Sequence, residues 1–307
     1  MEVIPAILAP TASGKTNLAV HLAKKIDGEV IGLDSRQIYE QISIGTAQPT
    51  TEEMQCVVHH LIGNKPLDEP ISAGHYAKLV LGCIDKIESK QKTPIVCGGA
   101  GLYYRALYSG IFDQSKSDLS VRKNLENMYD SGNAQKMLMN LKKIDLEYSK
   151  HIHINNKKRL IRALEIYEST GKTPSEHFNY QRSRPHPNIN LYSIYLNWDR
   201  TVLKKRISRR TSKMIKKGWI AEVKNLISIY PDFDLQPLDS IGFKQIVSYL
   251  NEQIKIEDLE MEINTKTYQY AVKQIKWFKK EKIDLIIDMD SKINIDQVTK
   301  KVLSAII

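Results

Sequence analysis

The most informative segment of the chain reads Ala9-Pro10-Thr11-Ala12-Ser13-Gly14-Lys15-Thr16. The apolar run Val3–Ala9 precedes it and predicts a buried strand, while Asn17–Ile26 follows with apolar residues at helical spacing. A glycine-containing loop between a strand and a helix is typical of a P-loop, whose backbone N–H groups and lysine bind phosphate groups. A chance match to a turn is the alternative, which the strand–loop–helix setting disfavours. The segment therefore predicts a polyphosphate site in which the Thr16 hydroxyl could ligate Mg²⁺.

Short apolar runs alternate with helical patterns along much of the chain. The further predicted strands are Val30–Leu33, Pro94–Cys97, Leu191–Trp198 and Asp284–Asp288. The clearest helical patterns between and after them cover Lys78–Lys90 and Leu259–Lys280. Strands that alternate with helices predict βαβ units and a parallel sheet. We expect an α/β fold with a P-loop NTPase-like parallel sheet core, a helical insertion domain and a helical C-terminal region.

The strand pattern is interrupted once, between residues 113 and 187. The patterns in this interval predict amphipathic helices over Ser120–Tyr129, Ala134–Ile144 and Asn156–Ser169. We therefore expect a helical insertion over residues 113–187. The P-loop core would then consist of residues 1–112 and 188–307, the latter carrying the C-terminal helices.

The composition excludes several classes of protein. With 42% apolar and 26% charged residues, the chain is an ordinary globular protein and not a disordered one. No segment approaches the ~18 uninterrupted apolar residues of a membrane helix. The apolar start Met1–Ala9 lacks the basic lead and cleavage site of a signal peptide. The 3 cysteines show no CxxC spacing, which argues against a zinc site or a disulfide framework. We expect a cytoplasmic protein with no membrane partner.

Charge is distributed unevenly along the chain. The whole chain has a net charge of +10, but residues 1–112 hold 10 basic and 11 acidic residues. Residues 151–220 hold 16 basic and 4 acidic residues, a net of +12. A near-neutral N-terminal third beside a basic middle suggests a catalytic core next to a surface that binds a polyanion. A solvated, lysine-rich helical face is the alternative.

A single carboxylate, Asp34, follows the second predicted strand. The third predicted strand ends in Cys97-Gly98-Gly99 and so lacks the acidic Mg²⁺ ligand that many P-loop NTPases place at a strand end. Because open α/β sheets bind ligands at the carboxyl ends of their strands, Asp34 is a candidate site residue. It could be a general base, a ligand in the metal shell, or a cap on the following helix.

Taken together, the motifs resemble those of the tRNA dimethylallyltransferase (IPP transferase) family. In chain order they are residues 9–16, Asp34–Gln37, Ile44–Pro49, His59–Ile62, Gly98–Tyr103, Asn155–Glu165, Arg206–Glu222, Ser240–Lys244 and Tyr270–Gln274. The P-loop alone is generic, whereas the whole set in this order is specific. The resemblance covers nearly the whole chain.

The resemblance implies a reaction. The family transfers a dimethylallyl group from dimethylallyl diphosphate to N6 of the adenine 3′-adjacent to the tRNA anticodon, with Mg²⁺ and with release of diphosphate. It also implies a helical insertion that grips the anticodon stem-loop, and we expect a monomer. Asp34 matches the family's base, and Lys15 and Thr16 match its diphosphate and Mg²⁺ ligands. Arg210 matches an arginine aimed at the diphosphate, although a solvated position on a basic helix is the alternative.

The resemblance further implies contacts with tRNA. The matching positions are Asp34, Ser35, Arg36, Gln37, Ala100, Arg122, Lys158, Arg159, Leu160, Ile161, Arg162, Ser240, Ile241, Gly242, Phe243 and Lys244. For any single Lys or Arg among them, a solvated surface charge is the alternative. Three positions depart from the family pattern: Ala100 replaces a hydroxyl residue, and Tyr268 and Val272 replace basic residues. The pair His59-His60 lacks metal-ligand spacing, so we expect it to form structural hydrogen bonds.

Three other functions compete with this interpretation. A small-molecule P-loop kinase would explain the phosphate loop but not the basic helical insertion. A transferase acting on free AMP or ADP would need the same core without an insertion that holds RNA. A non-catalytic RNA-binding module would not need the combination of Lys15, Thr16 and Asp34.

Overall fold

The structure is a computed structural model of the chain, and it describes residues 2–110, 118–182, 189–231, 235–290 and 292–306. The chain divides into two compact units. The larger unit comprises residues 1–108 and 188–307, and the smaller comprises residues 109–187. The ends of the insertion expected from the sequence, 113 and 187, lie outside the described residues.

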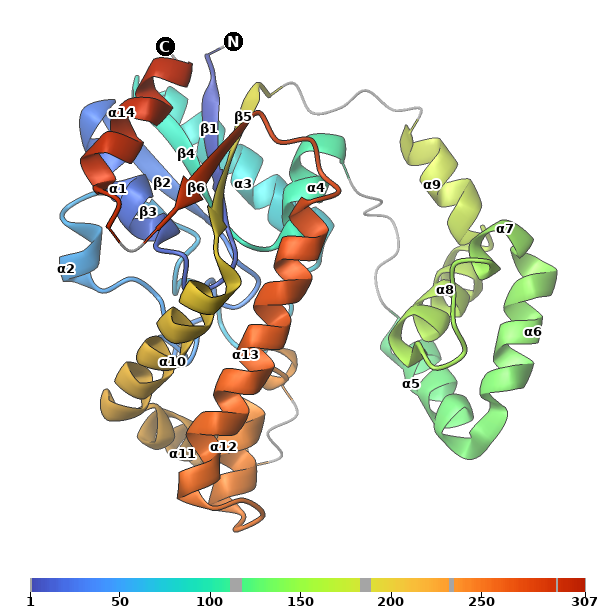
Figure 1. Cartoon of the computed structure of the whole chain (residues 1–307). Coiled ribbons are helices and arrows are strands. Elements are labelled where there is room, and N and C mark those ends of the chain that lie inside the picture. The colour runs from blue at the N-terminus through green and yellow to red at the C-terminus, as the bar shows by residue number, and fades with distance from the viewer. Residues whose placement is uncertain (1, 111–117, 183–188, 232–234, 291, 307) are drawn as a thin grey trace. The chain divides into compact units, whose positions relative to one another are not determined.

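The larger unit is built on a parallel sheet of six strands (Figure 1). The strands are β1 (Ile4–Leu8), β2 (Gly28–Leu33), β3 (His59–His60), β4 (Thr93–Gly98), β5 (Leu191–Trp198) and β6 (Leu285–Met289). Their order across the sheet is β3-β2-β4-β1-β5-β6, and every neighbouring pair is parallel. The predicted parallel α/β core is confirmed. Strands β2, β3 and β4 lie on one side of β1, and the later strands β5 and β6 lie on the other. The strand order therefore reverses at β1, and open α/β sheets bind ligands where such a reversal occurs.

Helices cover both faces of this sheet. They are α1 (Lys15–Lys25), α2 (Thr51–Met54), α3 (Ala73–Glu88), α4 (Gly101–Ser109), α10 (Arg200–Lys216), α11 (Trp219–Ile229), the 3₁₀ turn η2 (Gln236–Leu238), α12 (Phe243–Leu250), α13 (Ile256–Phe278) and α14 (Ile295–Ile306). Figure 1 shows α1 and α14 on one side of the sheet and α3 on the other. The central strands β1, β2 and β4 are therefore almost entirely buried, which explains why they consist mainly of apolar residues.

Strand β1 contributes side chains to two hydrophobic clusters, one on each face of the sheet. Ile4, Ala6 and Leu8 pack in the cluster with α3 and α4, whereas Ile7 packs with α1 and α14. Successive side chains of a strand point to opposite faces, so each apolar residue of β1 is buried on one face or the other. All five residues of β1 are buried.

The smaller unit is helical. It contains α5 (Leu119–Met128), the π-helical turn η1 (Tyr129–Asn133), α6 (Ala134–Ile144), α7 (Leu146–Ser149), α8 (Lys157–Thr170) and α9 (Pro174–Arg182). Its core joins Leu125 of α5, Leu141 of α6 and Leu164 of α8. Asp145 links α7 to α9 because its carboxylate accepts hydrogen bonds from the backbone N–H of Tyr148 and of Ser175, 2.9 and 2.8 Å long.

Most predicted elements agree with the structure to within a few residues. The main difference is at α3, which begins at Ala73, five residues before the predicted start, because the Ser72 side chain caps it by accepting from His75 N–H. The sequence analysis missed β3, a two-residue edge strand with polar side chains and no apolar run. Among the described residues, no helix combines the length and the apolarity needed to cross a membrane.

Candidate active site

The register of the sheet brings three loops to one edge. Leu8 of β1 and Leu33 of β2 both pair with Gly98 of β4, so these three strands end at the same level. The phosphate loop, Asp34 and the glycine pair Gly98-Gly99 follow these strand ends directly. This arrangement places the predicted anion-binding loop beside the predicted base.

The predicted phosphate loop lies between β1 and α1 and contains two residues with positive φ. Ala12 and Gly14 have φ angles of 62° and 85°, and helix α1 begins at Lys15. No side chain caps α1, which leaves its first N–H groups available to an anion. P-loops commonly have glycine at the position of Ala9. Ala9 fits there because its φ is not positive and its methyl group packs in the core cluster that contains α1.

One N–H group of the loop is already occupied. The amide of Gln274, from α13, accepts a 2.9 Å hydrogen bond from Thr11 N–H and donates one of 2.8 Å to the carbonyl of Gly99. Gly99 is needed at this point, because a Cβ there would lie 2.6 Å from Gln274 Nε2 and 2.7 Å from the Ala9 carbonyl. The anion-binding donors of the loop must therefore come from the residues after Thr11.

Two cations, Lys15 and Arg210, lie together beside the loop, and neither forms an ion pair with an acidic residue that the structure describes. Burial lowers the pKa of the Lys15 amine, an effect to which Arg210 adds and which Cys97 and Asp34 oppose. Burial also lowers the pKa of Arg210, against the influence of Asp34. Within the described part of the chain, Arg210 Nε is buried and has no hydrogen-bond partner. Two partly desolvated cations of this kind are suited to bind a polyanion.

Asp34 caps the turn that follows β2. Its Oδ1 atom accepts hydrogen bonds from the N–H groups of Arg36 and Gln37, 2.9 and 3.3 Å long. Tyr76 holds the strand end, since its hydroxyl donates to the Gly32 carbonyl at 2.7 Å and accepts from Asp34 N–H at 3.4 Å. The Oδ2 atom of Asp34 has no hydrogen-bond partner among the residues described here, so it can receive a proton while Oδ1 fixes the group in place.

The segment after Asp34 is fastened to the loop Ile44–Pro49. The side-chain amide of Gln37 donates to the carbonyls of Thr46 and Ala47, 3.1 and 2.8 Å long. The loop in turn is held by Glu222 of α11, whose carboxylate accepts from the N–H groups of Ile44 and Gly45, both at 2.8 Å. The amide donors of Gln37 thus serve the protein, which leaves its Oε1 atom for the predicted contact with RNA.

The predicted RNA contacts in the larger unit are of two kinds. Ser35 and Arg36 are half-buried beside Asp34, and Ala100 is half-buried after the glycine pair. In the segment Ser240–Lys244, Ile241 and Ser240 are half-buried and Lys244 forms a 2.5 Å ion pair with Asp239. Gly242 and Phe243 are buried; Phe243 packs against Trp219. The Phe243 side chain therefore serves packing, and only its backbone is available to RNA.

In the smaller unit, the predicted RNA contacts lie mainly on α8. Lys158 and Arg159 are exposed, and Arg162 forms a 3.1 Å ion pair with the buried Glu165. Arg122, on α5, forms a 3.1 Å ion pair with Glu126 one turn later. The remaining two predicted positions, Leu160 and Ile161, are 0% and 2% exposed. Their side chains pack the core of the unit, as the apolar period of α8 requires, so RNA could reach only their backbone.

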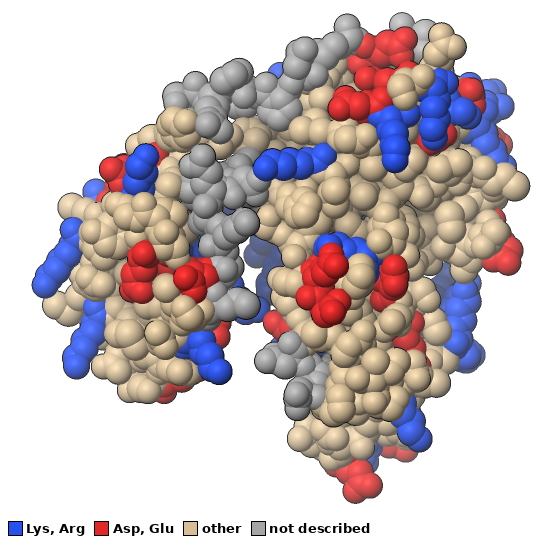
Figure 2. Space-filling model, turned by 180° about the vertical axis from the view of Figure 1, so that it is seen from behind, with Lys and Arg blue, Asp and Glu red and all other residues tan. Residues whose placement is uncertain are grey.

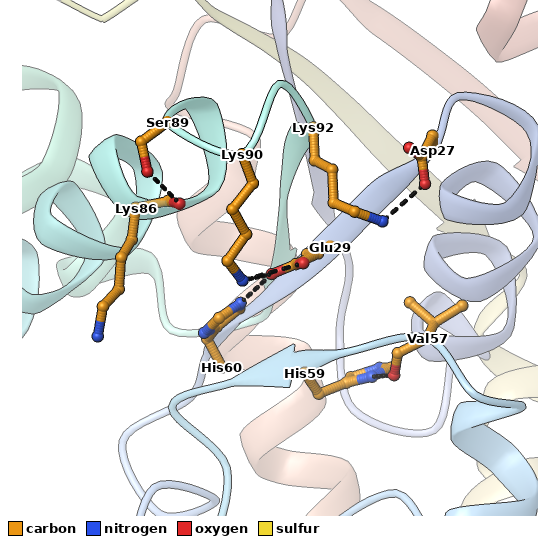
Figure 3. A network of polar contacts seen from close by, with 9 residues as sticks. All are labelled: Asp27, Glu29, Val57, His59, His60, Lys86, Ser89, Lys90 and Lys92. Carbon is orange, nitrogen blue, oxygen red and sulfur yellow. Dashed lines mark hydrogen bonds and ion pairs between the residues drawn. The ribbon is translucent and has the colours of Figure 1, made fainter.

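The two histidines form structural hydrogen bonds, as expected. His60 Nε2 lies 2.7 Å from a carboxylate oxygen of Glu29, which also binds Lys90 at 3.1 Å (Figure 3). His59 Nδ1 lies 2.9 Å from the Val57 carbonyl. Burial would raise the pKa of Glu29, but the hydrogen bonds from His60 and Lys90 outweigh it and hold that pKa below its usual value. Glu29 is the second residue of β2, so this network lies away from the end of the strand that Asp34 follows.

No group of three His, Cys, Asp or Glu side chains suited to a metal is present in the described residues. The oxygen donor that the phosphate loop offers is the half-buried Thr16 hydroxyl in the first turn of α1. Mg²⁺ prefers oxygen ligands and is commonly bound through one or two protein groups together with substrate phosphates. The donor set thus fits an ion that enters with a diphosphate.

Sequence reasoning missed four residues that shape this site: Gln274, Glu222, Arg206 and Trp198. Gln274, Glu222 and Arg206 lie within the motifs that carry the family resemblance, which was the available signal. Trp198 ends β5 and had no signal beyond the end of an apolar run.

Comparisons with known proteins agree with this geometry. The family model described as IPP transferase matches residues 37–281. The chain is 38% identical to the tRNA dimethylallyltransferase of Acetivibrio thermocellus, over 91% of this chain and 90% of that protein. It is 40% identical to the tRNA dimethylallyltransferase of a Thermoanaerobacter species, over 89% of this chain and 87% of that protein.

The chain is also similar to solved structures of transferases that act on tRNA. The tRNA isopentenylpyrophosphate transferase of Bacillus halodurans superposes with a TM-score of 0.72 at 34% identity, covering 100% of this chain and 97% of that one. A eukaryotic dimethylallyltransferase acting on tRNA superposes with a TM-score of 0.78 at 28% identity, covering 94% of this chain and 74% of that one. With a family model that spans most of its length and relatives that align over nearly all of it, the chain belongs to the IPP transferase family.

Proposed function

We propose that this protein transfers a dimethylallyl group from dimethylallyl diphosphate to N6 of the adenine 3′-adjacent to the anticodon of tRNA. One observation carries the proposal: the cations Lys15 and Arg210, which have no ion-pair partner among the described residues, and the carboxylate of Asp34 converge on the edge of the sheet where the phosphate loop opens. The loop suits a leaving diphosphate, and the carboxylate suits a group that gives up a proton.

The residues can be assigned roles in the transfer. The adenine N6 attacks C1 of the dimethylallyl group, the C1–O bond breaks, and its electron pair leaves with the diphosphate. Asp34 accepts the N6 proton through Oδ2 while Oδ1 stays fixed by Arg36 and Gln37. Lys15, Arg210 and the first N–H groups of α1 stabilise the charge that develops on the diphosphate. Mg²⁺ held by Thr16 and the phosphates would add further charge stabilisation.

The smaller unit would supply the contact with tRNA. Helix α8 begins with Lys157, Lys158 and Arg159 and has no acidic residue in its first turn. Lys157 forms a 2.6 Å ion pair with Asp130, whereas Lys158 and Arg159 are exposed at a helix end whose dipole disfavours cations. Such local conflicts are expected at functional sites. In the view of Figure 2, each unit by itself shows Lys and Arg side chains separated by uncharged surface and by small acidic groups, so RNA would contact each unit at several separate points.

A tRNA substrate would place the protein in the cytoplasm, and we expect it to act as a monomer, which light scattering can measure. The reaction is tested by incubating the protein with Mg²⁺, labelled dimethylallyl diphosphate and, in parallel, tRNA, AMP or ATP. Label is expected in tRNA alone. Label in AMP would support the free-nucleotide enzyme, and phosphoryl transfer from ATP without prenyl transfer would support a kinase.

A matched pair of variants tests the phosphate loop. Lys15→Ala should lower the rate of transfer by roughly 10² or more if Lys15 acts in the transition state. Lys25→Ala removes the same charge from an exposed position on the same helix and should leave the rate unchanged. Equal rates for the two variants would refute the assignment of this loop to the diphosphate.

A further inference from the structure

Two side chains from outside the phosphate loop hold its carbonyl groups. Arg206, on α10, donates from Nε to the carbonyl of Ala12 at 2.8 Å. Trp198, at the end of β5, donates from Nε1 to the carbonyl of Ser13 at 3.0 Å. These residues are 194 and 185 positions away from their partners, so the contacts are a property of the fold and not of the loop.

The two side chains also hold each other. The Arg206 guanidinium lies over the Trp198 ring, 4.3 Å from its centroid. Trp198 is 6% exposed and Arg206 is half-buried. A guanidinium stacked on a buried ring has little freedom to rotate, and its Nε–H is aimed by that stacking. The two side chains thus act on the loop as a fixed support.

Holding the carbonyls fixes the neighbouring N–H groups. In a planar trans peptide the C=O of one residue points opposite to the N–H of the next. The carbonyls of Ala12 and Ser13 are turned towards Arg206 and Trp198, so the N–H groups of Ser13 and Gly14 are turned the other way. Neither N–H has a hydrogen-bond partner in the described part of the chain, and the buried Ser13 hydroxyl has none either. Unpartnered donors of this kind form an anion-binding concavity.

We propose that Arg206 and Trp198 are positioning residues that orient the Ser13 and Gly14 N–H groups towards the diphosphate. The proposal rests on the proposed function of the loop. It assigns the two side chains an effect through the backbone and not through their own contact with the substrate. It therefore predicts that diphosphate binding depends on the two hydrogen bonds to the loop, and that the positive charge of Arg206 alone does not maintain this binding.

Two conservative variants remove the hydrogen bonds selectively. Trp198→Phe keeps a ring under the guanidinium but removes the donor to Ser13. Arg206→Lys keeps the charge but removes the planar Nε–H donor and the stacking. Arg209→Lys is the matched control, because Arg209 is exposed on the same helix. The affinity of each protein for inorganic diphosphate with Mg²⁺ is measured by calorimetry, and steady-state constants and thermal midpoints are measured in parallel.

We expect Trp198→Phe and Arg206→Lys each to weaken diphosphate binding about 2- to 10-fold, the effect of one net hydrogen bond. The KM for dimethylallyl diphosphate should rise by a similar factor, while the KM for tRNA stays unchanged. A general loss of structure would instead change both constants and the thermal midpoint. Arg209→Lys should bind diphosphate as the wild type does.

The outcomes separate the two proposals. A wild-type protein that does not bind diphosphate would refute the proposed function of the loop. A wild-type protein that binds it, with both variants binding equally well, would overturn the positioning role alone. If Trp198→Phe is unstable, Arg206→Lys alone tests the positioning role. A normal diphosphate affinity in that variant would show that the charge of Arg206 is sufficient for binding and would overturn the role.

Discussion

Gln274 offers the sharpest test of how the phosphate loop is held. Its side chain is 7% exposed, and both ends of its amide are used: Oε1 accepts from Thr11 N–H at 2.9 Å, and Nε2 donates to the Gly99 carbonyl at 2.8 Å. Gln274→Met keeps the length of the side chain and removes both hydrogen bonds. One backbone donor and one backbone acceptor would then lie without partners at the same place.

The magnitude follows from the burial of these two groups. A buried polar group that loses its partner costs about 1–3 kcal/mol. Gly99 is buried and Thr11 is half-buried, so water can restore only part of the loss. We expect Gln274→Met to reduce the free energy of unfolding by about 2–4 kcal/mol. For a unit of this size each kcal/mol shifts the thermal midpoint by about 2–4 °C, which gives a decrease of roughly 4–16 °C.

The assay is calorimetric unfolding of the wild type and of two variants. Gln269→Met is the matched control, because it makes the same change at an exposed position on the same helix α13 and should shift the midpoint by about 1 °C or less. Gln274→Met should also weaken binding of inorganic diphosphate, since the released loop no longer presents its donors in one arrangement. If the midpoint of Gln274→Met lies within about 1 °C of the wild type, the reasoning is wrong.

A second variant, Gln274→Glu, should make the free energy of unfolding depend on pH. In Gln274→Glu the carboxyl group can still accept from Thr11, but it can donate to Gly99 only when it is protonated. Burial raises the pKa of such a group above its unfolded value, so the protonated state stabilises the fold at low pH and this stability is lost as the pH rises through the raised pKa. Relative to the wild type, this variant should therefore become less stable between about pH 4 and pH 8.

Three further changes test other parts of the molecule. Asp34→Asn should lower the rate of transfer by roughly 10²-fold or more and leave diphosphate affinity unchanged, whereas a loss of that affinity would assign Asp34 to the metal shell. Glu29→Gln should be less stable than the wild type above about pH 4.5, and the difference should shrink as the pH falls through the lowered pKa of Glu29, as measured by chemical denaturation. A wild type and variant that unfold in parallel at all pH values would contradict this. Replacing the three basic residues 157–159 by Gln should flatten the dependence of tRNA affinity on salt and raise the KM for tRNA alone, and equal slopes would remove RNA binding from this segment.

The core of the fold was predictable because its signals are local. The central strands are rich in apolar residues, as burial on both faces requires, and the phosphate loop joins the first of them to an amphipathic helix. Asp34 could be proposed as a site residue because the carboxyl ends of parallel strands lie at one edge. Strand β3 was missed because it is two polar residues that pair only with the edge of β2.

The supports of the loop were harder to predict because they depend on tertiary contacts. A glutamine on a helix gives no local sign of its partner, and Gln269 and Gln274 lie on the same helix in opposite environments. Helical periodicity would have helped, since Ile263, Thr267 and Ala271 mark the buried face on which Gln274 also lies. Periodicity could have shown that the side chain is buried, but not that it binds the loop 263 residues away.

The phosphate loop and the carboxylate of Asp34 are held by separate sets of contacts. The loop is held by Gln274 of α13, Arg206 of α10 and Trp198 of β5. Asp34 lies in a segment that is fastened through Gln37 to the loop that Glu222 holds. Residues without shared partners contribute nearly additively. We therefore expect changes in the first set to alter the affinity for diphosphate, and changes in the second set to alter the rate through the proposed role of Asp34. The P-loop motif thus accounts for the loop itself, while residues far away in the chain form the hydrogen bonds that hold it.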